Sequence, residues 1–132
     1  MTRTPEDIAW AAGLFEGEGC VTISTVDGRK YLLASVSMHP RDRDVLERFH
    51  RIVGVGTLCG PHKNGMCRWA GHGSRLRPLL EDEEFVRHLG ARRRARIEEC
   101  LGIVDSQPAP NSLPRRPYNG GLPRKPRRAI AA

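Results

Sequence analysis

The chain lacks the features that mark exported, membrane-spanning and disulfide-stabilised proteins. No apolar run approaches the roughly 18–20 residues needed to cross a bilayer, and the longest one, at residues 31–38, contains two serines. The first residues, MTRTPEDIAW, do not form the basic-then-apolar pattern of a secretion signal. The four cysteines are widely scattered and form no CxxC pair, which favours reduced, buried thiols. We therefore expect a cytoplasmic protein, of bacterial or viral origin, with no membrane partner.

Aromatic residues are also few, at 5%, but hydrophobic residues make up 39% of the chain and charged residues 28%, which is typical of a globular protein. A length of 132 residues suits one compact domain, or one domain and a tail. The 22 basic residues exceed the 15 acidic ones and give a net charge of +7. A basic excess of this size favours a polyanionic partner, nucleic acid before membrane, over a small-molecule substrate.

The composition divides the chain after Val104. Residues 105–132 hold six of the ten prolines and six basic residues against one acidic residue, a net charge of +5. Such a segment cannot bury enough apolar surface to offset the entropy of ordering it. We expect a folded domain at 1–104 with a net charge of only +2 and a disordered basic tail at 105–132.

Periodicity and turn residues predict the elements of the domain. Thr4-Pro5 with two following acids is typical of a helix start, and apolar spacing continues that helix to about Phe15. Asp27-Gly28 predicts a two-residue hairpin turn. A second helix with Gly54 as its stop, a second hairpin and C-terminal helices then follow. The predicted ranges are 20–26 and 30–38 for the first hairpin, 42–53 for the helix, 55–70 for the second hairpin, and 74–80 and 91–104 for the last helices.

The second hairpin allows one alternative. Cys59, His62, Cys67 and His72 are separated by two, four and four residues, intervals that resemble a zinc knuckle with its ligand types permuted. A zinc-dependent RNA-binding module would follow. The hairpin interpretation is preferred, because it places the cysteines on strands, where they usually pack as small hydrophobic residues.

The segment Ala11-Ala12-Gly13-Leu14-Phe15-Glu16-Gly17-Glu18-Gly19 carries the chemistry. Ala9, Gly13 and Gly17 recur every four residues, so they share one helix face, where small residues let another backbone approach. Glu16 and Glu18 follow at the helix end, where acidic side chains oppose the helix dipole. This unfavourable placement suggests a bound cation or a charged partner. A glycine-rich helix end with two solvated acids is the plain structural alternative.

This segment resembles the LAGLIDADG motif of homing endonucleases, written here AAGLFEGEG. The predicted αββαββα order over roughly residues 5–104 is also the order of that family. The resemblance implies an α+β fold with a four-stranded antiparallel saddle-shaped sheet. It also implies a site-specific double-strand DNA endonuclease of a mobile element, free-standing or encoded within an intron. The alternative on the same scaffold is a non-cleaving DNA- or RNA-binding protein, such as a maturase or a regulator.

The resemblance implies roles for the motif residues. Glu18 matches the acid that binds a divalent metal, with Gly17 able to offer a backbone carbonyl, and oxygen ligands suit Mg²⁺. Glu16 matches the earlier acid, which is more often structural. A single motif implies a homodimer, with Ala9, Gly13, Glu16 and Gly17 at its interface. Arg92 or Arg93 matches a basic residue that stabilises charge at the cleaved phosphate.

The same resemblance places the sheet in the major groove of double-stranded DNA. Strand alternation assigns Thr22, Ser24, Tyr31 and Ser35 to the DNA-facing side, with Arg29 and Lys30 at the tip of the first hairpin. In the second hairpin, Lys63 and Arg68 are the candidates for DNA contact. His39 stands where many members carry a polar residue that positions water, although a histidine before Pro40 can also simply cap a bend.

Overall fold

The computed structural model describes residues 3–108. The helices are α1 (Pro5–Glu18), α2 (Arg43–Val53), α3 (Gly73–Leu80), α4 (Glu83–Val86) and α5 (Ala91–Asp105), with a single 3-10 turn, η1 (Pro40–Asp42), before α2. The strands are β1 (Gly19–Val26), β2 (Arg29–Met38), β3 (Thr57–Cys59) and β4 (Cys67–His72). The α+β class and the first six elements are confirmed. The short helix α4 was not predicted, and α1 runs three residues further than expected.

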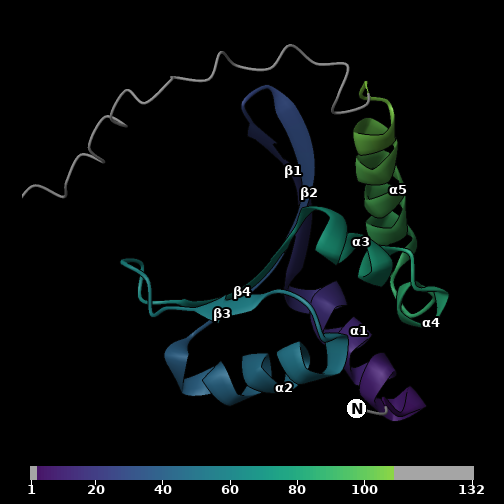
Figure 1. Cartoon of the computed structure of the whole chain (residues 1–132). Coiled ribbons are helices and arrows are strands. Elements are labelled where there is room, and N and C mark those ends of the chain that lie inside the picture. The colour runs from purple at the N-terminus through teal and green to yellow at the C-terminus, as the bar shows by residue number, and fades with distance from the viewer. Residues whose placement is uncertain (1–2, 109–132) are drawn as a thin grey trace, which may run out of the picture.

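The strands form one antiparallel sheet in the order β1-β2-β4-β3 (Figure 1). The first hairpin closes at Asp27 and Gly28, whose φ angles of 52° and 78° are those of the expected tight turn. The β3–β4 pair joins β2 through β4, so the centre of the sheet is the β2–β4 contact. The predicted four-stranded antiparallel sheet is therefore confirmed.

Alternation along the strands gives the sheet two different faces. On the covered face, Val21, Leu32, Ala34, Val36 and Trp69 are buried together with the apolar sides of the helices. We call the other side the open face, since the helices lie on the covered side (Figure 1). By the strand register, the open face carries Cys20, Thr22, Ser24, Tyr31, Leu33, Ser35, Ser37, Thr57, Cys59, Arg68, Ala70 and His72.

The helix faces were predicted well from the sequence. Ile8, Ala11, Ala12 and Phe15 are the buried residues of α1, and its N-terminus is a capping box. The Asp7 amide donates to Thr4 Oγ1 at 3.1 Å, and the Thr4 amide donates to Asp7 Oδ2 at 3.2 Å. Gly54 ends α2 in the left-handed conformation, with φ of 71°, as expected for a helix stop.

The folded part extends beyond the boundary expected at Val104. Asp105 is the last residue of α5 and accepts two hydrogen bonds of 2.8 Å from Arg77 of α3. The Arg77 hydrogen bond lowers the pKa of the Asp105 carboxyl and raises that of the guanidinium. Gln107 also bonds to both backbone groups of Lys30, at 2.6 and 2.8 Å. The expected tail from residue 109 onward lies outside the described residues.

Among residues 3–108, no helix is long and apolar enough to cross a membrane.

Candidate functional site

The zinc alternative is contradicted by the register of the second hairpin. Cys59 pairs with Arg68 and lies on the open face, whereas Cys67, one residue before Arg68, points to the covered face. Cys59 is exposed and Cys67 is buried in the core. The described part of the chain also contains no group of three or more His, Cys, Asp or Glu side chains that could hold a metal ion.

The end of α1 brings Glu16, Gly17 and Glu18 to the edge of the sheet. Gly19 then starts β1 in an extended conformation, with φ of −83° and ψ of 161°. A glycine is required at this position, because a Cβ there would lie 2.6 Å from Cδ1 of Phe15. Because Gly19 has no Cβ, the chain can pass close to Phe15 and enter β1 directly after Glu18. The helix therefore ends three residues later than apolar spacing predicts.

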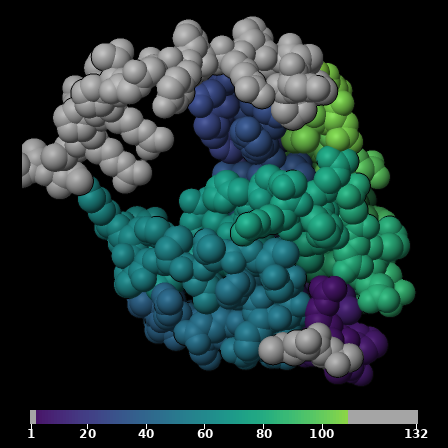
Figure 2. All heavy atoms as spheres, in the orientation of Figure 1, coloured from purple at the N-terminus to yellow at the C-terminus, as the bar shows by residue number. Residues whose placement is uncertain are grey.

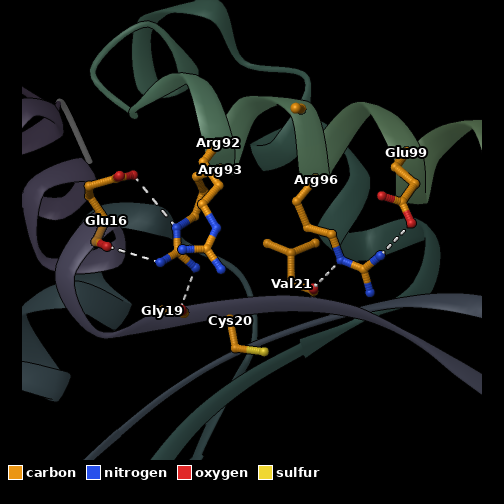
Figure 3. A pocket seen from close by; sticks show the side chains of 9 residues that line it. Glu16, Gly19, Cys20, Val21, Arg92, Arg93, Arg96 and Glu99 are labelled. Atoms are coloured by element: carbon orange, nitrogen blue, oxygen red, sulfur yellow. Dashed lines mark hydrogen bonds and ion pairs between the residues drawn. The ribbon is translucent and has the colours of Figure 1, made fainter.

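The structure separates the two acids of the motif. Glu16 is turned toward α5, where its Oε2 atom lies 3.6 Å from Nε of Arg93 (Figure 3). Glu18 is exposed, and within the described residues its carboxylate has neither a hydrogen bond nor an ion pair. Of the two, only Glu18 has its charge free at an unfavourable helix end. The structural interpretation of Glu16 is supported by its intrachain partner.

Basic residues of α5 border the same corner. A surface pocket of about 660 Å³ is lined by Glu16, Gly19, Cys20, Val21, Arg92, Arg93, Ala95, Arg96 and Glu99 (Figure 3). The structure thus brings both candidate arginines to the end of α1, 74 or more residues away in sequence. Glu18 and Gly17 are not among the residues that line this pocket.

The two candidate arginines differ in what they contact. Arg92 is exposed, and its guanidinium has no hydrogen bond or ion pair within residues 3–108. Arg93 is half-buried and donates to the backbone carbonyls of Glu16, at 3.0 Å, and of Gly19. Arg92 is therefore the free cation, and Arg93 is bound within the fold.

The expected DNA-facing residues fall on the open face where strand alternation put them. Ser24 pairs with Tyr31 and Cys20 with Ser35 across β1 and β2, and Thr22 pairs with Leu33. Arg68 of β4 is on the same face, and its Nε is buried without a hydrogen-bond partner in the described residues. The sequence analysis did not assign the other polar members of this face, Ser37, Thr57 and His72, to DNA contact. Strand alternation across β3 and β4 could have found them.

The remaining candidate residues, at the hairpin tips and after β2, differ in their exposure and in their hydrogen-bond partners. Lys63 is exposed in the loop between β3 and β4. Arg29 donates to the carbonyl of Pro108 at 2.9 Å. Lys30 alternates with Tyr31, so its side chain does not belong to the open face. His39 accepts a hydrogen bond of 3.1 Å from the Arg41 amide, which supports the bend-capping interpretation of this histidine.

The hollow of the molecule lies between the two hairpins. Figure 2 shows the first hairpin, in blue, and the β3–β4 segment, in teal, as two projections from the body with open space between them. The open face of the sheet connects the two projections.

Comparison with known proteins places the fold. No family profile matches the chain, and no curated protein matches it in sequence. Solved structures do match, and the fold is that of the LAGLIDADG homing endonucleases.

Three of these structures show how similar the fold is. Homing endonuclease I-CvuI in complex with its target has a TM-score of 0.65 and 22% identity, over 76% of this chain and 67% of that one. The LAGLIDADG meganuclease I-AabMI, bound to uncleaved DNA, has a TM-score of 0.62 and 24% identity, over 74% and 36%. The group I intron-encoded endonuclease I-CeuI, complexed with DNA, has a TM-score of 0.62 and 18% identity, over 80% and 56%.

Proposed function

We propose that this chain is a site-specific double-strand DNA endonuclease of the LAGLIDADG homing type, which hydrolyses phosphodiester bonds as a homodimer with a divalent metal ion. The observation that carries the proposal is the free carboxylate of Glu18, at the end of α1 and directly before the first strand of the open sheet. A protein that only binds DNA gains nothing from an unpaired acid beside a polyanion. The similar structures named above, which hold DNA or a target, support the same class.

The donor set at the end of α1 fits Mg²⁺. Glu18 offers a carboxylate and Gly17 a backbone carbonyl, both hard oxygen donors, and Mg²⁺ binds through one or two carboxylates together with phosphates and water. One chain holds too few donors for a complete site, so a second copy of α1 and the DNA phosphates supply the rest. When bound, the ion would activate water and stabilise the leaving oxygen.

The remaining residues take roles that their contacts allow. Arg92, the free cation beside the end of α1, neutralises charge that develops at the cleaved phosphate. Thr22, Ser24, Tyr31, Ser35 and Arg68 read base edges from the open face. Arg29, Lys30 and Lys63, at the two hairpin tips, contact phosphates, which position the protein without reading sequence.

The exposed side of α1 supplies the dimer contact. Gly13 and Gly17 are exposed, and a Cβ built on either would meet nothing within 4 Å. A glycine inside a helix costs about 1 kcal/mol relative to alanine, and no contact among the described residues explains that cost. Two copies of α1 packed through Ala9, Gly13 and Gly17 would bring two Glu18 carboxylates together on one twofold axis.

Gly13→Ala tests this contact. We expect the substitution to raise the stability of the single protomer by about 0.5–1 kcal/mol, because the helix gains a better former in open space. The same methyl group keeps two α1 helices apart, so we expect at least a tenfold weaker dimer, on the order of 1.4 kcal/mol. Sedimentation velocity with thermal unfolding measures both quantities. Asp44→Ala, on the exposed side of α2, is a control that should leave the dimer unchanged.

Removal of residues 109–132 tests the basic tail. This segment carries six basic residues and no acidic one, and ending the chain at Pro108 keeps the Asp105 and Gln107 contacts intact. We expect weaker binding to all duplexes alike, and a slope of log affinity against log salt that is smaller by several units. Affinity titrations at four salt concentrations on a target and a scrambled duplex measure this. A loss confined to the target would contradict the proposed role.

A selection experiment tests the proposed function itself. The full chain is incubated with a randomised double-stranded DNA library in Ca²⁺ to recover bound duplexes, and in Mg²⁺ to recover cut ends. We expect one near-palindromic site in both selections, because a twofold dimer reads two equivalent half-sites. Recovery of unrelated duplex sequences that share no common site would contradict the proposal.

A further inference from the structure

Arg93 of α5 contacts the backbone and side chains at the end of α1. Its Nη2 donates to the Glu16 carbonyl at 3.0 Å and its Nη1 to the Gly19 carbonyl, while Nε lies 3.6 Å from the Glu16 carboxylate. The guanidinium carbon also lies 5.6 Å from the centre of the Phe15 ring. One side chain of α5 thus holds the whole helix-to-strand junction (Figure 3).

We propose that Arg93 is a positioning residue that fixes the backbone of Glu18 for metal binding, and that it does not itself touch the phosphate. The inference rests on the proposed function, because it assigns Arg93 a task within that site. The two carbonyls it binds belong to residues 16 and 19, which bracket Glu18. Holding both sides of this short segment fixes the position of the Glu18 backbone, from which the carboxylate extends.

The chemistry of the junction requires an arginine. The last carbonyls of a helix have no intrahelical partner and carry its partial negative charge. A planar guanidinium with five donors can bond one such carbonyl, that of Glu16, together with the first carbonyl of β1, that of Gly19, whereas a lysine ammonium is a single point charge. The charge of Arg93 is in turn balanced by Glu16, so the junction adds no net charge beside Glu18.

The N-terminus of α5 is shaped for this arrangement. A Cβ on Gly90, the residue before α5, would lie 2.7 Å from Oε1 of Glu16. Gly90 therefore leaves the space in which the Glu16 carboxylate reaches Arg93. Because Gly90 has an ordinary φ of −70°, space and not backbone conformation explains this glycine.

Arg96 is the neighbouring arginine that can serve as a control for Arg93. Arg96, one turn further along α5, donates to the next outward carbonyl of β1, that of Val21, at 3.1 Å. It also pairs with Glu99 at 2.7 Å. Arg96 also donates to Thr22 Oγ1 at 3.5 Å. Because it supports the same strand edge without contacting α1, Arg96→Ala is a matched control for the helix-to-strand junction and for the Mg²⁺ requirement, but not for DNA affinity.

The first measurement needs no DNA and no metal. Amide hydrogen exchange of the peptide that covers residues 15–21 is compared for the wild type, Arg93→Ala, Arg93→Lys and Arg96→Ala. Exchange protection reports local opening, and we expect Arg93→Ala to exchange at least about tenfold faster in this peptide, with α2 unchanged. Arg93→Lys should fall between the two, and it serves for the comparison if the alanine variant does not fold. Unchanged exchange in both Arg93 variants would overturn the proposal.

The second measurement separates positioning from direct catalysis. Partners that orient a ligand alter metal affinity by about 10–100-fold, so Arg93→Ala should raise the half-saturating Mg²⁺ concentration for cleavage about tenfold. Its rate at saturating Mg²⁺ and its DNA affinity in Ca²⁺ should stay within about threefold of the wild type. Arg96→Ala should not shift the Mg²⁺ requirement. A lower saturated rate for Arg93→Ala with an unchanged Mg²⁺ requirement would show a direct role and overturn the inference.

A failure of the proposed function looks different from a failure of this inference. If the wild type cuts no duplex, the endonuclease proposal is wrong. Mn²⁺ binding to the DNA complex, followed by electron paramagnetic resonance, then replaces cleavage as the readout for Arg93. Equal Mn²⁺ affinity in the wild type and in Arg93→Ala would overturn the positioning role by itself.

Discussion

Glu18→Gln should abolish Mg²⁺-dependent cleavage and leave DNA affinity within a few-fold of the wild type. The amide keeps the size of the side chain and one carbonyl oxygen, but it loses the negative charge that a hard cation requires. We expect the cleavage rate to fall about 10³-fold, which corresponds to about 4 kcal/mol of transition-state stabilisation. Single-turnover cleavage in Mg²⁺ and affinity in Ca²⁺, both on the selected duplex, measure the two quantities. Because Glu18 is exposed and without a partner among the described residues, the substitution should not alter the fold.

Glu16→Gln is the matched control for this prediction, since it removes the same charge two residues earlier. Glu16 is paired with Arg93 within the chain, so its loss should alter cleavage much less, by about tenfold at most. Full cleavage by Glu18→Gln would remove this residue from the mechanism. An equal loss in both variants would show that the acids act together, contrary to the division that the structure indicates.

Trp69→Ala should be the most destabilising single substitution. The Trp69 side chain is fully buried, and its ring lies edge-on to Phe49 at 4.8 Å between centroids. Its Nε1 also donates to the Val55 carbonyl at 2.9 Å, which fixes the chain that leads into β3. Removing the ring leaves a large cavity where β4 meets α2, and we expect a loss of about 3–5 kcal/mol in the free energy of unfolding. Urea unfolding followed by circular dichroism measures it.

Trp69→Phe separates packing from hydrogen bonding at the same position. The phenyl ring keeps most of the aromatic contact with Phe49 but leaves the Val55 carbonyl without its donor. We expect a loss of about 1–3 kcal/mol, as for an unsatisfied buried polar group. If Trp69→Ala were as stable as Trp69→Phe, Trp69 would not have the core-packing role described here.

Local patterns were enough to predict most of the fold. The buried residues of α1 and α2 follow helical spacing, and the first hairpin follows from alternation around Asp27-Gly28. The end of α1 was predicted less well, because apolar spacing stops at Phe15 while the helix continues as an exposed turn. Helix α4 was missed because its single buried residue, Phe85, gives no periodicity. Its signal was the Asp82 side chain that caps it.

The candidate site shows where sequence reasoning stops. The resemblance to the motif implied different roles for Glu16 and Glu18, but nothing in the neighbouring residues themselves showed which acid is bound within the chain and which is free. The distinction comes from Arg93, which lies 77 residues away and reaches Glu16 only because α5 crosses the edge of β1. The same contact also distinguishes Arg93 from Arg92. Because the two residues are neighbours in an arginine-rich run, the sequence alone could not show which of them is bound within the fold. The open face, by contrast, was predictable, because a strand's alternation is a local property.

Under the proposed function, this chain cuts both strands of a specific duplex. The most direct test incubates the full chain, in excess, with the selected duplex carrying a different label on each strand, in Mg²⁺ and separately in Ca²⁺. We predict one cut in each strand in Mg²⁺, placed symmetrically about the centre of the site, and intact bound duplex in Ca²⁺. Intact duplex in both ions, with the complex still formed, would contradict the proposed endonuclease function and would identify a DNA-binding protein that does not cleave.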